Sequence, residues 1–366
     1  MKKTMTIKLQ VIFIATIFLA LSAYAWFKPA DKISDSELRN LAQFPEVNAQ
    51  KLWDGSFMTE FESYTLDQFP FREEFRTVKA VTYLYALRQS DNNGIYIEDG
   101  YAVKMEYPLN DESVKYAIGR MQNVYDKVMA DTDAKCYIAV IPDKNYYLAE
   151  EHGALSIDYD WVFSTVRNEA DFAQYIDITD LLGKEDFYRT DTHWNQANIT
   201  DIAERLAGTM GAELDNQYTV NTVGIPFYGV YYGQAALPMK PDTLKYLTND
   251  AIEAASVFDW QNNKPLAMYD EDKMNTRSPY DLFLGGSLSM ITIDNPLAET
   301  DKELVVFRDS FGSSLVPLLV SGYKKITVFD IRYLPGDRIG NFIEIDNQDV
   351  LFIYSTSVLN NGTTIK

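Results

Sequence analysis

The chain contains little cysteine, little histidine and no excess of basic residues. Its single cysteine, Cys136, excludes an intramolecular disulfide, and the apolar stretch around it predicts a small buried side chain. The formal net charge of −20 would repel nucleic acid, so nucleic acid is not expected as a partner. With 46% hydrophobic and 23% charged residues, the composition is that of a globular protein with a core. No internal repeat or low-complexity tract interrupts it.

Only two histidines are available to any mechanism that depends on histidine. His152 lies in an acidic segment that reads as a solvated loop, whereas His193 follows Asp191 by two residues and precedes an amphipathic stretch. A zinc site is not expected, because neither a second histidine cluster nor a cysteine ligand accompanies His193. The sequence therefore predicts no metal and no cofactor.

The N-terminus combines basic residues with an apolar run. Three lysines occur among the first eight residues, and residues 11–27 are apolar except for Thr16 and Ser22. This pattern is typical of an export signal, with the following chain on the extracytoplasmic side. Residues 1–27 are a signal peptide or an N-terminal membrane anchor. Both alternatives stay open, because Ala23 and Ala25 form a small-x-small site before Trp26 in a run just long enough to span a bilayer.

The rest of the chain divides by its periodicity into an N-terminal region, residues 28–107, and an α/β domain, residues 108–366. Helical patterns alternate with short apolar strand patterns in the second part, which predicts a mainly parallel sheet with helices on both faces. Residues 212–300 break this alternation and are expected to be an insertion with one helix near 241–247. The predicted strands are 136–141, 175–178, 304–307, 326–330 and 350–354, and the predicted helices of this domain are 114–128, 161–173, 199–210 and 311–321.

Ser310 directly follows the predicted strand 304–307 and begins a helix. A serine on a strand-to-helix turn exposes its hydroxyl at the carboxyl edge of the sheet, and its own N–H can face a developing oxyanion. A helix N-cap at Asp309 or Ser310 is the structural alternative. Asp191 and His193 also lie after a strand pattern, and Asp191 is close enough to orient His193 as a general base, although a loop hydrogen bond is the simpler interpretation. The coincidence of these groups at one sheet edge favours a triad.

Several longer blocks carry a family resemblance. They are 40–45, 67–72, 188–194, Tyr280-Asp-Leu-Phe-Leu-Gly-Gly286 and Arg308-Asp-Ser310. In this order they resemble the DHHW family, which is related to the SGNH-hydrolase-like acetyltransferase domains of alginate O-acetylation proteins. The resemblance implies an SGNH-hydrolase-like α/β fold.

By the same resemblance, Asp191 and His193 are the acid and base of a catalytic triad, and Ser310 is the nucleophile. The order Asp, His, Ser is characteristic of the alginate-type branch and is opposite to that of ordinary SGNH hydrolases. Thr192 replaces one histidine of the family motif, and Tyr354-Ser355 stands where the family often has asparagine. A side-chain amide in the oxyanion hole is thus missing, which leaves the N–H groups of Ser310 and, as a weaker assignment, Gly286.

The resemblance implies transfer or removal of O-acetyl groups on a cell-surface or secreted polysaccharide. The enzyme is then an SGNH-type O-acetyltransferase or a carbohydrate esterase, with an acyl donor that the sequence does not identify. Tyr228, Tyr232 and Trp194 are weak candidates for contacts with a glycan, because aromatic faces stack on sugar rings. The rival interpretation is a non-catalytic glycan-binding or envelope-assembly protein that keeps the fold.

Overall fold

The computed structural model describes residues 2–34, 36, 37, 39–276 and 278–366. Contacts divide these residues into two compact units. The N-terminal unit extends to Asn92 and includes the short segment Gly233–Pro238. The α/β unit contains Asn93–Tyr232 and Met239–Lys366.

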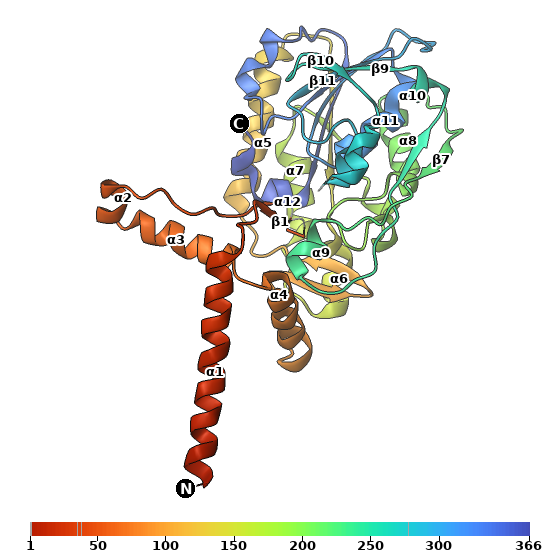
Figure 1. Ribbon diagram of the computed structural model, residues 1–366. Helices are drawn as coiled ribbons and strands as arrows, with labels where there is room; N and C mark the ends of the chain where they lie inside the picture. The colour runs from red at the N-terminus through yellow and green to blue at the C-terminus, as the bar shows by residue number, and fades with distance from the viewer. Residues whose placement is uncertain (1, 35, 38, 277) are drawn as a thin grey trace. The chain divides into compact units, whose positions relative to one another are not determined.

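The N-terminal unit is mainly helical (Figure 1). Its first helix runs from Lys2 to Phe27, and the part Thr6–Phe27 is long and apolar enough to cross a membrane. This helix is consistent with a signal peptide or an anchor. The remaining elements are α2 (Ala49–Trp53), α3 (Ser56–Asp67), α4 (Arg72–Val81), the π-helical turn η1 (Thr82–Ala86) and the antiparallel pair β1 (Ile33–Ser34) and β2 (Arg39–Asn40).

An eight-stranded sheet forms the centre of the α/β unit, in the order β10-β9-β11-β13-β12-β14-β5-β6. The strands β13, β12, β14, β5 and β6 are parallel, while β11, β9 and β10 continue the sheet in antiparallel pairs. The bounds are β5 (Lys135–Ile141), β6 (Gln174–Tyr175), β9 (Ser256–Asp259), β10 (Lys264–Leu266), β11 (Met290–Asp294), β12 (Glu303–Arg308), β13 (Lys325–Phe329) and β14 (Asp349–Ser355). Two antiparallel pairs lie outside this sheet. They are the hairpin of β3 (Ile95–Glu98) and β4 (Tyr101–Lys104), and the pair of β7 (Thr219–Thr222) and β8 (Lys245–Thr248).

Helices cover both faces of this sheet, as Figure 1 shows. Successive strand residues point to opposite faces, so β14 sends Phe352 into one core and Leu351 into the other. The core around Phe352 includes α5 (Asp111–Val128) and α7 (Tyr159–Glu169), and the core around Leu351 includes α8 (Thr200–Thr209) and α11 (Gly312–Leu319). The predicted α/β fold class is therefore confirmed. The other helices are α6 (Lys144–His152), α9 (Val230–Ala235), α10 (Asp250–Ala254) and α12 (Thr356–Asn360).

Side-chain caps set the start of several helices. Asn110, Asp143 and Asp158 accept hydrogen bonds from backbone N–H groups in the first turns of α5, α6 and α7. Each cap satisfies a donor that the helix itself leaves free. Because Asp143 lies two residues after the end of β5, its cap turns the chain at the same sheet edge that holds the ends of β12 and β14.

The segment 212–300 differs from its expected structure in two ways. The helix predicted near 241–247 is wrong, because residues 245–248 form β8, which pairs with β7 more than twenty residues earlier in the chain. This long-range pairing overrides the local helical preference. In addition, residues 256–294 contribute β9, β10 and β11 to the main sheet, so that part of the segment belongs to the sheet itself.

Phe352 tests the packing of the sheet. Its ring is fully buried and stacks on Phe307 at 4.6 Å between centroids. Phe352→Ala should lower the free energy of unfolding by about 3–5 kcal/mol, because a cavity replaces the ring. Phe342→Ala, at a position that is 50% exposed, should change it by less than about 0.5 kcal/mol. Urea unfolding of the two variants measures the difference, and equal effects would contradict the assigned core.

Candidate functional site

The turn between β12 and α11 presents Ser310 at the carboxyl end of the central parallel strands. Ser310 is half-buried, and it lies between the buried Asp309 and the first turn of α11. The Asp309 carboxylate accepts hydrogen bonds from the N–H groups of Phe311 at 3.0 Å and Ser355 at 2.8 Å. It thereby ties the turn to the end of β14. Gly312 permits the tight turn, because a Cβ there would lie 2.6 Å from the Cβ of Arg308.

A second loop, residues 188–193, brings Asp191 and His193 to the same edge. The N–H of Tyr188 donates to the carbonyl of His193 at 3.0 Å, which closes the loop. The Asp242 carboxylate holds its outer side by accepting from the N–H groups of Arg189 at 2.9 Å and Thr190 at 2.7 Å. This loop therefore depends on a residue that lies about fifty positions later in the chain.

The structure brings Asp191, His193 and Ser310 into one hydrogen-bonded row. Nδ1 of His193 lies 2.6 Å from Oδ1 of Asp191, and Nε2 of His193 lies 2.8 Å from Oγ of Ser310. The N–H of His193 also donates to Asp191 Oδ1 at 3.0 Å. With Nδ1 protonated and bonded to Asp191, Nε2 is free to accept the proton of Ser310. This geometry permits general-base activation of a serine nucleophile.

The segment 227–232 encloses the carboxylate of Asp191 from the other side. The N–H of Val230 donates to Asp191 Oδ2 at 2.9 Å, and the N–H of Gly229 donates to the hydroxyl of Thr190 at 3.0 Å. A Cβ on Gly229 would lie 2.2 Å from the Cβ of Asp191, so only glycine permits this approach. The sequence pattern did not reveal this role, although Gly229 lies between Tyr228 and Tyr232, the two tyrosines expected to contact a glycan.

Asp191 is charged despite its burial. Burial by itself would raise its pKa, but electrostatic attraction to His193 and the hydrogen bonds from His193 and Val230 hold the pKa below its ordinary value. An ionised Asp191 can stabilise the imidazolium that forms when His193 takes a proton. The carboxylate therefore has the charge state that a triad requires.

Tyr280 supports the ring of His193. The two rings stack at 3.8 Å between centroids with an angle of 7° between their planes. The hydroxyl of Tyr280 donates to Ser314 Oγ at 2.7 Å, and burial raises the pKa of Tyr280 well above its ordinary value, so the hydroxyl stays neutral. The tyrosine belongs to the block 280–286 noted in the sequence, but that pattern alone did not reveal contact with His193.

A buried lysine lies behind the loop that carries Asp191. Lys144 is 1% exposed, and its Nζ donates to the carbonyl of Tyr188 at 2.9 Å. Nζ also lies 4.9 Å from the ring centroid of Tyr231, whose hydroxyl donates to Oγ1 of Thr192 at 3.0 Å. Burial lowers the pKa of Lys144 to about 7, against the opposing attraction of Asp191 and other nearby carboxylates. The hydrogen bond from Lys144 thus connects the start of α6 to the loop 188–193.

The N–H groups near Ser310 differ in availability. No hydrogen bond joins the Ser310 N–H to another of the described residues, and this N–H lies immediately before α11. In contrast, the N–H of Gly286 donates to the carbonyl of Phe283 at 3.0 Å, and that of Ser355 donates to Asp309. An oxyanion role for Gly286 would require its N–H to be shared, so this assignment stays a prediction.

The three aromatic candidates for substrate contact have different surroundings. Trp194 is fully buried, and its Nε1 donates to Oγ of Ser314 at 2.8 Å. Contact of Trp194 with substrate stays a prediction, and in the structure the indole packs beneath the turn that carries Ser310. Tyr228 is 40% exposed, and its ring lies 4.5 Å from that of the half-buried Tyr232. These two tyrosines remain accessible to a ligand.

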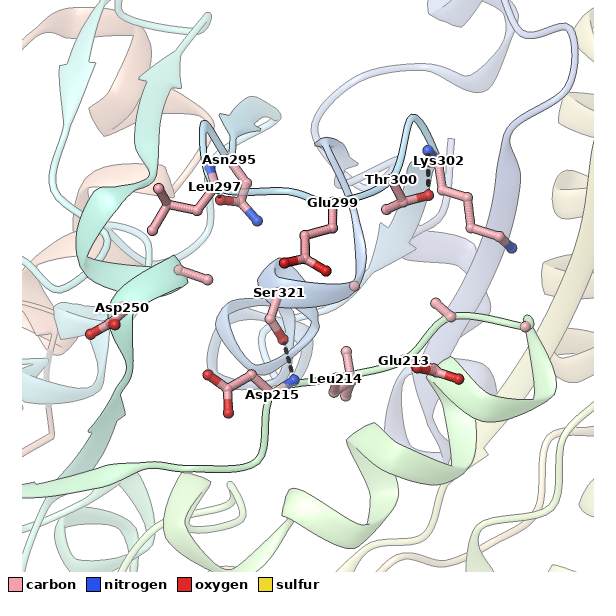
Figure 2. A pocket seen from close by; sticks show the side chains of 14 residues that line it. Glu213, Leu214, Asp215, Asp250, Asn295, Leu297, Glu299, Thr300, Lys302 and Ser321 are labelled. Atoms are coloured by element: carbon pink, nitrogen blue, oxygen red, sulfur yellow. Dashed lines mark hydrogen bonds between the residues drawn. The ribbon is translucent and has the colours of Figure 1, made fainter.

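A cavity of about 650 Å³ lies away from the triad (Figure 2). Glu213, Asp215, Glu299 and Lys302 are among the side chains that line it. Lys302 precedes β12 and Ser310 follows it, so the length of one strand separates the cavity from the triad. Among the described residues, no group of three or more His, Cys, Asp or Glu side chains is placed to hold a metal ion.

Gly229 provides a direct test of how Asp191 is held. Gly229→Ala should displace the Asp191 loop and lower the melting temperature, because the new methyl group has no space. Gly224→Ala is the matched control, since no atom lies within 4 Å of a Cβ at that position. Only Gly229→Ala should show a lower melting temperature in thermal unfolding and slower labelling of Ser310 by a fluorophosphonate. Normal behaviour of Gly229→Ala would contradict the described approach.

Lys144 should give the protein a pH-dependent stability. Its folded pKa of about 7 lies below the ordinary value of 10.5, so between these values the unfolded chain binds more protons. The stability of the wild type relative to Lys144→Met should therefore rise as pH increases from about 7 to about 10. Urea unfolding across this range measures the difference, with Lys135→Met as an exposed control. A difference that is constant with pH would overturn the expectation.

Comparison with known proteins agrees with the resemblance predicted from the sequence. The model of the DHHW family, described as DHHW protein, matches residues 182–329, a range that contains Asp191, His193 and Ser310. No curated protein is similar enough to count as a match.

Three solved structures are similar to the chain over about three quarters of its length. A DHHW family protein from Eubacterium siraeum is 21% identical with a TM-score of 0.57, and the match covers 75% of this chain and 95% of that one. Bacillus cereus PatB1 with a sulfonyl adduct is 16% identical with a TM-score of 0.58, covering 72% and 97%. The O-acetyltransferase domain of Pseudomonas putida AlgJ is 14% identical with a TM-score of 0.45, covering 73% and 92%. The similarity of this chain to the DHHW family, and with it the SGNH-hydrolase-like α/β fold, is therefore confirmed.

Proposed function

We propose that this chain is an extracytoplasmic serine enzyme that transfers or removes O-acetyl groups on a cell-surface or secreted polysaccharide. The observation that carries the proposal is the row from Asp191 through His193 to Ser310, with distances of 2.6 and 2.8 Å. A helix cap or a loop hydrogen bond would not require all three groups in this order. A proton-transfer role uses both ring nitrogens of His193 in this way.

In the proposed mechanism, Ser310 forms a covalent acyl-enzyme. Nε2 of His193 takes the hydroxyl proton while Oγ attacks the carbonyl carbon of an acetyl ester, and Asp191 stabilises the imidazolium. His193 then gives the proton to the leaving oxygen, which departs as an alcohol. A sugar hydroxyl or water attacks the acyl-enzyme in the second half, again with His193 as the base. Acetyl transfer and hydrolysis therefore share every catalytic group.

The tetrahedral intermediates need donors for their oxyanion. The N–H of Ser310 lies before the first turn of α11, where backbone dipoles favour negative charge. Tyr354-Ser355 stands where an asparagine amide is common in the family, so the proposed mechanism uses backbone N–H groups. The missing amide is also the observation that favours the alternative, a non-catalytic glycan-binding or envelope-assembly protein.

The choice of acetyl groups and glycans rests on the family resemblance together with the aromatic pair beside the triad. Tyr228 and Tyr232 flank Gly229 and Val230, which contact the Asp191 loop. An aromatic pair at this position is suited to stacking on a sugar ring. Acyl transfer is preferred over hydrolysis, because an acceptor seated on these rings would compete with water for the acyl-enzyme.

The location outside the cytoplasm is proposed from the N-terminal helix. Its apolar part, Thr6–Phe27, follows a basic flank, and in the described structure its side chains are mostly exposed. A polysaccharide substrate at the cell surface agrees with this topology.

Substitution of the triad tests the chemistry. Ser310→Ala and His193→Ala should each lower kcat on acetyl esters on the order of 10³-fold or more, because triad members act as a unit. For the same reason, the double variant should be little worse than either single variant. Ser313→Ala on the next turn is a control with a buried hydroxyl that does not contact His193.

Folding must be matched in all of these variants, which circular dichroism and thermal unfolding check. Near-normal activity of a folded Ser310→Ala variant would rule out the serine mechanism. A wild-type protein that binds glycan but neither hydrolyses esters nor reacts with fluorophosphonate would support the non-catalytic alternative.

An acceptor test separates acetyl transfer from hydrolysis. Adding an oligosaccharide should divert acetyl from free acetate to acetylated sugar, measured by mass spectrometry. Tyr228→Ala or Tyr232→Ala should lower the ratio of acetylated sugar to free acetate more than it lowers the rate of ester cleavage. The reason is that the rings hold the acceptor and do not take part in proton transfer. Acetate release that is unchanged by every acceptor, with no acetylated sugar, would favour the carbohydrate esterase.

A further inference from the structure

The helix formed by α4 and η1 exposes its apolar face. Phe71, Phe75, Val78 and Tyr85 recur at helical spacing and are 50–67% exposed. Helices of soluble proteins normally bury such an apolar stripe, whereas this helix leaves it exposed.

Charged residues hold the helix to its own unit instead. Arg72 and Arg76 form ion pairs with Glu37 at 2.7 and 3.3 Å, and Nη2 of Arg76 donates to the carbonyl of Gly233 at 2.6 Å. Ala80, on the same side of the helix, is fully buried. The polar side therefore faces the protein and the apolar side faces outward, which is the reverse of the usual arrangement.

The exposed face is continuous with the end of the apolar helix α1. The ring of Tyr24 in α1 stacks on Phe71 at 6.0 Å between centroids and 8° between planes. The ring of Phe69 contacts that of Phe75 at 5.6 Å. Trp26, also in the last turn of α1, is 72% exposed. Aromatic side chains at the end of a membrane span are typical of the membrane–water interface.

An apolar cavity extends this surface toward α3. It has a volume of about 230 Å³, and its lining includes Leu21, Ala25 and Trp26 of α1 together with Phe61 and Phe69. The cavity lies beside the last two turns of α1, at the depth where lipid chains would surround a retained anchor. The lining is mainly apolar, with Ser22, Thr65 and Gln68 as polar members, and it is suited to part of an acyl chain.

We propose that α1 stays in the membrane as an anchor and that the apolar face of α4 and η1, defined by Phe71, Phe75, Val78 and Tyr85, lies in the lipid bilayer at the boundary between headgroups and acyl chains. An amphipathic helix at this depth buries its apolar face while its polar face stays out of the hydrocarbon. The Arg72 and Arg76 pairs with Glu37 then fix the helix to the N-terminal unit. The bilayer contact thus includes more than the first helix alone.

Site-specific fluorescence tests this placement in the full chain. Phe75→Cys and Val78→Cys, each labelled with a nitrobenzoxadiazole probe, are reconstituted into vesicles of phosphatidylethanolamine and phosphatidylglycerol. Cys136 should not compete for label, because burial raises the pKa of its thiol to about 12. Both probes should show blue-shifted emission and lose most of their intensity when lipids with nitroxide-labelled acyl chains are included. Tyr116→Cys, on the partly exposed surface of α5, supplies the comparison.

Three results would overturn the proposal. Emission typical of water at both positions would mean that the face is solvated. Quenching no greater than at position 116 would remove the specific bilayer contact. A blue shift without lipid quenching, accompanied by energy transfer between labelled copies, would assign the face to contact with a second copy. None of these measurements depends on enzymatic activity, so the proposed function can fail independently.

Discussion

The arrangement of the triad depends on the burial of the Asp191 carboxylate. Removing a charge from water costs several kcal/mol unless hydrogen bonds and an opposite charge compensate for it. Compensation comes from His193 on one side and from the N–H of Val230 on the other. Because Gly229 has no side chain, the second segment approaches closely enough to donate. The charge that would support catalysis therefore requires two distant segments to pack without a gap.

The second requirement is a fixed turn at Ser310. Asp309 bonds to its own turn and to the end of β14, so the nucleophile candidate is held by the neighbouring strand as well as by its own. Trp194 and Tyr280 both bond to Ser314, and Tyr280 also stacks on His193. The base and the serine are thus supported by a shared layer of buried side chains.

Charged side chains have different roles in the N-terminal unit and in the α/β unit. In the α/β unit, the buried Asp191 belongs to the triad, and the buried Lys144 lies behind the loop that carries it. In the N-terminal unit, Arg72 and Arg76 attach a helix to the protein and leave its apolar face outward. A membrane-bound enzyme that modifies a surface polysaccharide would need both arrangements. Its catalytic groups would lie in one unit and its membrane contact in the other.

The sequence by itself determined the parallel strands, the main helices and the candidate chemical groups, because these follow from local patterns. Short apolar runs and helical spacing predicted the parallel strands and the helices on both faces, and the scarcity of histidine singled out His193. Tertiary structure alone decided how the groups meet. The approach of Gly229 to Asp191, the hold of Asp242 on the 188–193 loop and the burial of Trp194 all join residues far apart in the chain, as does the pairing of β7 with β8 that replaced a predicted helix. Local periodicity does not encode such contacts, because they depend on which surfaces the complete fold brings together.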